Sequence, residues 1–201
     1  MDKYRNFDEL KKNEKEGEDY TVLSVNAGSE TAVIAPHGGG IEPGTFDIAS
    51  SIAGKEFTFY SFKGIKEKDN RFLHISSTKF DEPAGLEIVK NAFIVIAIHG
   101  CRDADEIVNI GGKNNELVKR LSAQLEADGF TVKRECAKEL AGVNPENICN
   151  RCRSGKGVQL EISRGLREKM FKDFRTIQPQ RKLKKFYSFV SSVRKTLLDT
   201  Q

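Results

Sequence analysis

The chain has 201 residues, of which 38% are hydrophobic and 31% are charged, and its formal net charge is +4. This composition is ordinary for a soluble domain, and the small net charge argues against a dedicated nucleic-acid binder. The longest apolar run, residues 92–98, is far shorter than the ~18–20 residues of a membrane span. We therefore expect one domain over residues 1–201, monomeric and without nucleic-acid or membrane partners.

Residues 1–20 form a charged N-terminal extension or helix that lacks the apolar core of a signal peptide. We expect the chain to be made and kept in the cytoplasm, and to be released only if the cell lyses. The cysteines include the C-x-x-C pair Cys149 and Cys152, whereas Cys101 and Cys136 stand alone. The pair could be a redox motif or half of a zinc site, but reduced thiols are the prediction for a cytoplasmic chain.

Apolar periodicity predicts strands that alternate with helices along the chain. A helix at 7–12 and strands at 21–25 and 31–35 come first, followed by a helix at 43–54 and a strand at 57–62. A helix that begins at Pro83, the strand 92–98, a helix from 114 that ends at Gly129 and the strand 131–136 follow. The last elements are the strand 157–163, a helix at 164–174, a turn at 178–182 and a helix at 183–197.

The order and composition of these elements indicate the fold class. The strands 31–35 and 92–98 are nearly continuous apolar runs, as strands buried on both faces are. From residue 31 onward such strands alternate with helices, which is typical of a sheet with helices packed on it. We predict an α/β fold: a single three-layer α/β/α domain around a mostly parallel, mixed sheet.

Each of the three most apolar strands leads to a residue that can take part in catalysis. The run TAVIAP precedes His37, AFIVIAI precedes His99, and GVQL precedes Glu161. In open α/β sheets, ligands bind at the carboxyl ends of the strands. Side chains on neighbouring strands, about 4.8 Å apart, can meet there, so we predict that these three residues converge.

The segment HGGGIE separates Glu42 from His37 by three glycines, which exclude a stable helix. The glycines allow the backbone to turn back, so that Glu42 points at an ion held by His37. Two imidazoles and one carboxylate suit a catalytic zinc, and we predict that His37, Glu42 and His99 bind one Zn²⁺ per chain. The alternatives are hydrogen-bonded loop histidines and a glycine loop that binds phosphate through its amides.

Glu161 is the predicted catalytic residue, because a carboxylate at the end of a buried strand is costly unless it is paired or used. As a general base it would take a proton from the attacking water and pass it to the leaving amine; the alternative is a salt bridge to Arg164 or Arg153. Arg102, Arg153 and Arg164 are predicted to bind substrate carboxylates, for which guanidinium groups are well suited. His74 is either a substrate contact or an ordinary strand histidine.

In four segments the chain resembles the phage-type poly-γ-glutamate hydrolases: APHGGGIEPGT, LHISSTKFDEP, IAIHG and NRCRSGKGVQLEISRGLR. These segments occur in the family's order and spread over residues 31–168. The resemblance implies a fold similar to that of the zinc carboxypeptidases, zinc bound by His37, Glu42 and His99, and Glu161 as the catalytic carboxylate. It also implies cleavage of γ-glutamyl amide bonds in the poly-γ-glutamate capsule of certain bacteria, which a phage would use to clear the capsule after host lysis.

Two other functions fit the same residues. The first is a zinc amidohydrolase of small N-acyl or γ-glutamyl amides, which would share the zinc site and lack an extended groove. The second is a non-catalytic module that binds anionic polymer or phosphate through the HGGG amides and the basic loop around Cys152, and that holds no metal.

Overall fold

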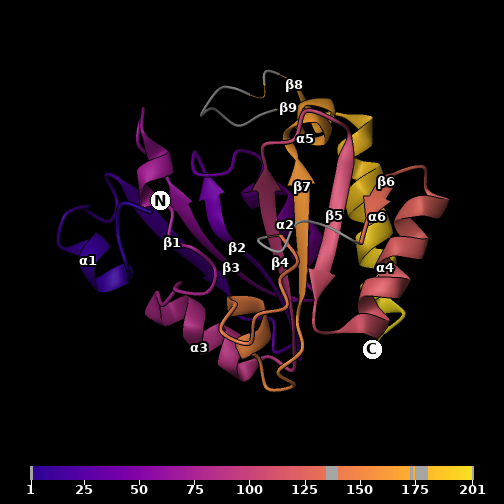
Figure 1. Ribbon diagram of the computed structural model, residues 1–201, viewed down its shortest axis with the longest axis horizontal. Helices are drawn as coiled ribbons and strands as arrows, with labels where there is room; N and C mark the ends of the chain where they lie inside the picture. The colour runs from indigo at the N-terminus through magenta and orange to yellow at the C-terminus, as the bar shows by residue number, and fades with distance from the viewer. Residues whose placement is uncertain (1, 135–139, 173, 175–180, 201) are drawn as a thin grey trace.

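A mixed sheet of seven strands runs through the computed structural model, which describes residues 2–134, 140–172, 174 and 181–200 (Figure 1). Its strands are β1 (Tyr20–Val25), β2 (Thr31–Gly39), β3 (Thr58–Gly64), β4 (Ile94–Cys101), β5 (Ile107–Gly112), β6 (Thr131–Lys133) and β7 (Val158–Ser163). Their order across the sheet is β1-β3-β2-β4-β7-β5-β6. The four strands β3, β2, β4 and β7 are parallel, whereas β1 is antiparallel to β3 and β5 is antiparallel to β7. The predicted α/β fold with a mostly parallel, mixed sheet is confirmed.

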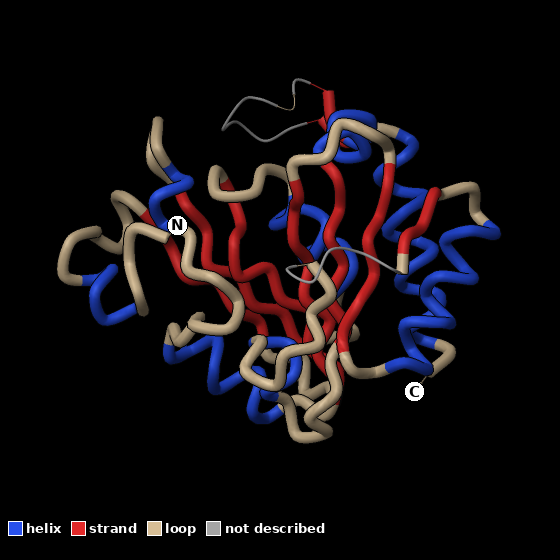
Figure 2. The backbone as a smooth tube through the Cα atoms, viewed as in Figure 1, coloured by secondary structure: helices blue, strands red, loops and turns tan. Residues whose placement is uncertain are grey.

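Helices cover both faces of this sheet (Figure 2). One face packs against α2 (Thr45–Ala53), α4 (Asn115–Ala127), α5 (Arg164–Met170) and α6 (Lys184–Leu198). The other packs against α1 (Phe7–Lys11), α3 (Pro83–Asn91) and the short 3₁₀ helices η1 (Asn70–Leu73) and η2 (Ile148–Arg151).

Adjacent residues of β2 show why the sheet needs both layers. Val33 and Ile34 are each fully buried, but Val33 packs in the same core as Ile48 of α2, and Ile34 in the same core as Val89 of α3. Burial of each such aliphatic side chain contributes about 1.5–3 kcal/mol. The continuous apolar run at 31–35 therefore reflects a strand buried on both faces, as predicted.

Local signals begin and end the helices close to the predicted positions. Gly54 ends α2 with a φ of 57°, a conformation that favours glycine. Pro83 is the first residue of α3, and the side chain of Glu82 accepts hydrogen bonds from the next two free amides. The side chain of Asn114 caps α4 by accepting from the amide of Leu117. None of the described helices is both long enough and apolar enough to cross a membrane.

Three elements differ from the sequence prediction. The prediction contains no strand at β5, because its sequence IVNIGG is short and ends in two glycines. Strand β2 continues to Gly39 instead of ending at Ala35. Helix α5 ends at Met170, where the predicted helix continues to residue 174, and the chain enters β8 (Phe171–Lys172), which pairs with β9 (Arg181–Lys182).

Some predictions lie partly outside the described residues, namely the end of the strand 131–136, the start of the turn 178–182, and Cys136. The other three cysteines are free thiols, as predicted. Cys149 and Cys152 are both buried, and burial raises the pKa of the Cys149 thiol well above its ordinary value. A thiol held in this protonated form is a poor nucleophile and a poor metal ligand.

A buried carboxylate, Glu14, ties the N-terminal segment to the body of the fold. Glu14 is 7% exposed and accepts hydrogen bonds from Tyr4 Oη, from Lys3 Nζ at 3.1 Å and from Lys66 Nζ at 2.6 Å. Burial alone would raise the pKa of Glu14, but these donors together lower it to about 2. The folded structure therefore stabilises the ionised form of Glu14 over the protonated form.

Glu14→Gln is expected to lower the free energy of unfolding by about 2–3 kcal/mol at pH 7, because it removes the buried charged acceptor shared by Tyr4, Lys3 and Lys66. The native pKa lies below the ordinary 4.5, so the contribution of Glu14 is complete above pH 4.5 and is lost as pH falls toward 2. Urea unfolding at pH 7 and pH 3 should show the difference between the two chains shrinking at the lower pH. A difference that stays constant with pH, or an equal effect of the exposed Glu18→Gln, would refute this role.

Candidate metal centre

Three neighbouring strands carry the predicted site residues. His37 lies in β2, His99 in β4 and Glu161 in β7, and His99 is directly opposite Glu161 in the parallel β4–β7 pair. Residues paired in this way point to the same face of a sheet. The sequence prediction placed His37 and His99 just after the ends of their strands, whereas both lie inside strands that continue past them; Glu161 lies within its strand, as the predicted range 157–163 has it.

A bulge in β2 turns His37 toward His99. Regular alternation from Val33 and Ala35 would place His37 on the opposite face of the sheet from Ala97 and His99. Between Ala35 and Gly38, however, β2 advances three residues while β3 advances two. After this one-residue insertion, each side chain of β2 points to the face opposite the one that regular alternation would give. The His37 side chain therefore lies on the same face as His99.

The loop after β2 returns Glu42 to the same point. The amide of Gly40 donates to Gly64 O at 3.0 Å, and the amide of Glu42 donates to His37 O at 2.9 Å, which closes a tight turn. Glu42 Oε2 then accepts from the amide of Gly100 in β4 at 2.8 Å. These bonds fix the carboxylate over the two imidazoles, and they also occupy two amides of the glycine loop that a phosphate would need.

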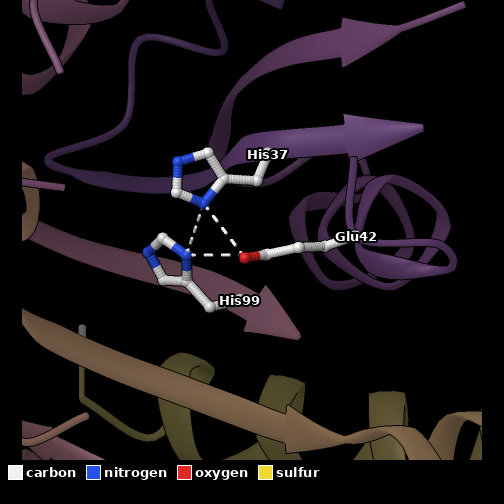
Figure 3. Close-up of side chains that lie close together, drawn as sticks. All are labelled: His37, Glu42 and His99. Carbon is white, nitrogen blue, oxygen red and sulfur yellow. Dashed lines mark hydrogen bonds and ion pairs between the residues drawn. The ribbon is translucent and has the colours of Figure 1, made fainter. Parts of the chain in front are cut away.

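His37, Glu42 and His99 form a compact triad (Figure 3). His37 Nδ1 lies 3.1 Å from His99 Nδ1 and 3.2 Å from Glu42 Oε1. His99 Nδ1 lies 3.6 Å from Glu42 Oε2. Both histidines are 1% exposed, whereas the Glu42 side chain is partly exposed.

The contacts of the remaining ring nitrogens allow both Nδ1 atoms of the triad to be unprotonated when the two histidines are neutral. His37 Nε2 lies 2.8 Å from the carbonyl of Ile75, which only accepts, so the proton of a neutral His37 is on Nε2. If the proton of a neutral His99 is also on Nε2, this N–H can donate to Ser77 Oγ, 3.3 Å away. Both Nδ1 lone pairs and a carboxylate then converge, which is the arrangement a metal ion satisfies.

Electrostatics agree with a site for a cation. Burial alone would raise the pKa of Glu42, but the two imidazoles hold it well below its usual range. Burial opposes the charged form of His99, yet hydrogen bonding to Glu42 and the charge of Glu161 raise its pKa. The site therefore keeps negative charge on Glu42 in the interior, and a bound cation would compensate it.

Glu161 lies beside the triad and has Gln159, rather than an arginine, as its hydrogen-bond partner among the described residues. It is 7% exposed, and its Oε1 accepts from Gln159 Nε2 at 2.9 Å. The salt bridges considered from the sequence do not form, since Arg164 pairs with Glu168 and Arg153 with Glu30. Burial raises the pKa of Glu161 to about 7, within the range in which a carboxylate both takes and gives a proton near neutral pH.

Known proteins similar to this chain identify its family. The sequence model for poly-gamma-glutamate hydrolase matches residues 4–192. The chain belongs to the poly-gamma-glutamate hydrolase family. Its sequence is 40% identical over 171 residues to UPF0714 protein YndL of Bacillus subtilis (strain 168), covering 85% of this chain and 67% of YndL. The resemblance seen in the sequence motifs is confirmed.

Two solved structures have the fold of this poly-gamma-glutamate hydrolase family member. A bacteriophage poly-gamma-glutamate hydrolase superposes with a TM-score of 0.95 at 28% identity, covering 100% of this chain and 98% of that one. A zinc-free apo structure of YndL superposes with a TM-score of 0.92 at 35% identity, covering 100% and 99%.

In this family member, a cavity of about 530 Å³ opens beside Glu42. Its lining includes three of the predicted substrate-binding residues, His74, Arg102 and Arg164. Lys3 and Arg71, which the sequence analysis did not single out, also line it. The cavity is therefore rich in cationic side chains and adjoins the triad.

Arg153, the fourth predicted substrate-binding residue, lies elsewhere. Its guanidinium pairs with Glu30 and lies over the ring of Phe93, with its carbon 5.7 Å from the ring centroid. Glu30 and Phe93 immediately precede β2 and β4, so Arg153 lies near the amino ends of these strands, away from Glu42. The sequence misplaced it because the loop before β7 crosses the sheet at that end.

Arg167 was not among the predicted site residues, although it is one of the arginines close to Glu161 in the sequence. It is buried and donates to the carbonyls of Ile162 at 3.0 Å, Pro43 at 2.6 Å and Cys101 at 2.8 Å. One side chain thus joins β7, the Glu42 loop and the end of β4. The only signal in the sequence is the proximity of Arg167 to Glu161, and nothing in it predicts these partners.

Arg167→Lys is expected to lower the free energy of unfolding by about 2–4 kcal/mol, because one ammonium group cannot replace three fixed guanidinium hydrogen bonds. Urea unfolding measures the change directly. Arg164→Lys, in the same helix but exposed and paired with Glu168, is the matched control and should change stability by about 0.5 kcal/mol or less. Equal stability of Arg167→Lys and the unsubstituted chain would contradict the role given to Arg167.

Proposed function

We propose that this chain is a zinc-dependent hydrolase that cleaves the γ-glutamyl amide bonds of poly-γ-glutamate. The observation that carries the proposal is the close approach of the triad: His37 Nδ1 lies 3.1 Å from His99 Nδ1 and 3.2 Å from Glu42 Oε1, and His99 Nδ1 lies 3.6 Å from Glu42 Oε2. Ligand atoms at ~2.0–2.1 Å from a tetrahedral zinc lie about 3.4 Å apart. Two histidines and a glutamate are also a ligand set of catalytic zinc sites, which keep a further position open. The zinc-free form described for YndL supports the choice of metal.

Zinc bound there would polarise the scissile carbonyl and lower the pKa of a bound water. Glu161 would accept a proton from the attacking water and deliver it to the leaving amide nitrogen. Its position opposite His99 and its raised pKa support this role. Glu42 and the two histidines then act as ligands only.

The charge of the cavity supports an anionic polymer as substrate. Its lining includes Lys3, Arg71, Arg102, Arg164 and Arg167, against the acids Asp2 and Glu42. Poly-γ-glutamate carries one α-carboxylate on each residue, and arginines bind carboxylates in a bidentate manner. In this proposal the polymer is the capsule of certain bacteria, and the enzyme of a phage or prophage clears that capsule.

Arg102→Gln and Arg164→Gln are each expected to raise KM for the polymer about tenfold with a smaller change in kcat, which corresponds to about 1.4 kcal/mol of lost carboxylate binding. Initial rates against polymer concentration give both constants. Arg153→Gln is the matched control, since Arg153 pairs with Glu30 away from the cavity, and it should leave KM unchanged. A KM for both cavity variants equal to that of the unsubstituted enzyme would show that these arginines do not bind substrate.

Elemental analysis of protein purified without added metal tests the proposal, together with digestion of the polymer before and after chelation. We expect one zinc per chain, polymer shortening that stops on zinc removal, and recovery when zinc returns. A metal-free protein that still binds polymer would support the non-catalytic module instead. Cleavage of small amides with no shortening of long polymer would support the small-amide hydrolase.

A further inference from the structure

One short segment contacts the outer nitrogens of both triad histidines. Residues His74–Ser77, which follow η1, are called the outer segment here. The Ile75 carbonyl accepts from His37 Nε2 at 2.8 Å, and Ser77 Oγ lies 3.3 Å from His99 Nε2. Such outer partners fix the tautomer and ring orientation of metal-binding histidines. The position of this segment therefore sets how the two Nδ1 atoms face each other and Glu42 (Figure 3).

Asp2 anchors the outer segment from the N-terminal end of the chain. Its Oδ1 accepts from His74 Nδ1 at 2.7 Å and its Oδ2 accepts from the amide of Ser76 at 2.8 Å. The two anchored residues flank Ile75, so the carbonyl that meets His37 lies between two fixed points. The His74 ring also lies against the His37 ring in a tilted arrangement, with centroids 4.1 Å apart and an interplanar angle of 33°.

We propose that Asp2 is a positioning residue for the metal centre: through the outer segment, it holds His37 and His99 in the orientation that binds the ion. This inference rests on the proposed zinc site, and it assigns Asp2 no contact with the metal or the substrate. In this arrangement the His74 imidazole links Asp2 to the His37 ring. Loss of the Asp2 carboxylate would free the outer segment to shift while all three ligands remain present.

The test uses the full chain with Asp2→Ala, freed of metal and titrated with zinc in competition with a chromophoric chelator. We expect the zinc dissociation constant to rise about tenfold, at the lower end of the 10–100-fold typical of lost outer partners, because Asp2 acts one step further out. The visible absorption of the cobalt-loaded chain should change as well, since it reports ligand geometry. Asp2→Ala also removes two hydrogen bonds from the metal-free chain, so the melting temperature of that form is measured alongside to separate lost stability from lost affinity.

Asp81→Ala is the matched control. Asp81 Oδ1 accepts from the amide of Phe7 at 2.6 Å and so anchors α1 without touching the outer segment. It should leave zinc affinity and the cobalt spectrum unchanged. Asp2→Asn keeps one acceptor oxygen and should give an intermediate affinity, which provides the same test if Asp2→Ala does not fold.

The outcomes separate this inference from the proposed function. Failure of the unsubstituted chain to bind zinc would overturn the proposed function itself. Zinc bound by the unsubstituted chain with equal affinity in both Asp2 variants would overturn only the role of Asp2. Equal weakening by Asp2→Ala and Asp81→Ala would also overturn it, since the effect would then come from general loosening of the N-terminal region.

Discussion

Replacing Glu161 by glutamine is expected to lower kcat by about 10²–10⁴-fold while zinc stays bound. The amide keeps the size of the side chain and can still accept the hydrogen bond from Gln159, but it cannot take up a proton from water. Rates of polymer shortening and the zinc content of the same preparation, measured side by side, check both parts. Wild-type turnover in this variant would show that another group moves the proton.

The same substitution is expected to stabilise the metal-free chain. The native pKa of Glu161 is about 7, above the ordinary 4.5, so the folded chain favours the neutral acid. Stability is therefore lost as pH rises from about 4.5 to 7, and the loss is complete above pH 7. Glu161→Gln removes this term and should raise the free energy of unfolding at pH 8 by about 1–3 kcal/mol.

Urea unfolding in the presence of a chelator measures this stability effect. The gain should disappear at pH 4, where the carboxyl group is neutral in both states. Glu106→Gln, at an exposed position on the loop before β5, is the control and should have little effect. A Glu161→Gln chain that is less stable than the unsubstituted one at pH 8 would mean that the carboxylate is well compensated where it lies.

Replacing His99 by glutamine is expected to abolish turnover and to weaken zinc binding by more than the 10–100-fold seen when only an outer partner is lost. Zinc that binds only the folded chain at about 100 times its dissociation constant adds about 2.7 kcal/mol to stability. The unsubstituted chain should therefore melt at a higher temperature with zinc than without it, and His99→Gln should lose this shift at the same zinc concentration.

Arg102→Gln serves as the control for this measurement, because Arg102 lines the cavity but is not one of the triad residues. It should keep the zinc-dependent rise in melting temperature. If His99→Gln also keeps the full rise, zinc binds somewhere other than the triad.

The sequence predicted much of the fold because its strongest signals are local. The apolar runs at 31–35 and 92–98 can be buried only in the middle of a sheet, and Gly54 ends a helix without help from distant residues. Strand β5 was missed because its short, glycine-ended sequence gains its stability from pairing with β7 and β6.

The sequence could indicate which residues form the candidate site, but not how the backbone brings them together. The glycines after His37 indicate a turn, which suggested that Glu42 returns to the histidine. The bulge at β2 could not be seen, because it depends on pairing with β3, and without it His37 would face away from His99. Regular alternation alone would therefore have argued against bringing these two histidines together.

Contacts between distant residues explain the remaining misses. Arg153 and Arg167 are both basic residues close to Glu161 in the sequence, yet one pairs with Glu30 and the other reaches the Pro43 carbonyl. Asp2 meets His74 across most of the first half of the chain. No local pattern encodes such partners, since they follow from how the loops cross the ends of the sheet.

The most direct test of the zinc centre is anomalous diffraction at the zinc absorption edge from crystals of the chain grown with zinc. We predict one strong peak at ~2.0–2.1 Å from His37 Nδ1, from His99 Nδ1 and from one oxygen of Glu42. A map with no peak between these three atoms, at full zinc occupancy elsewhere in the crystal, would contradict the account.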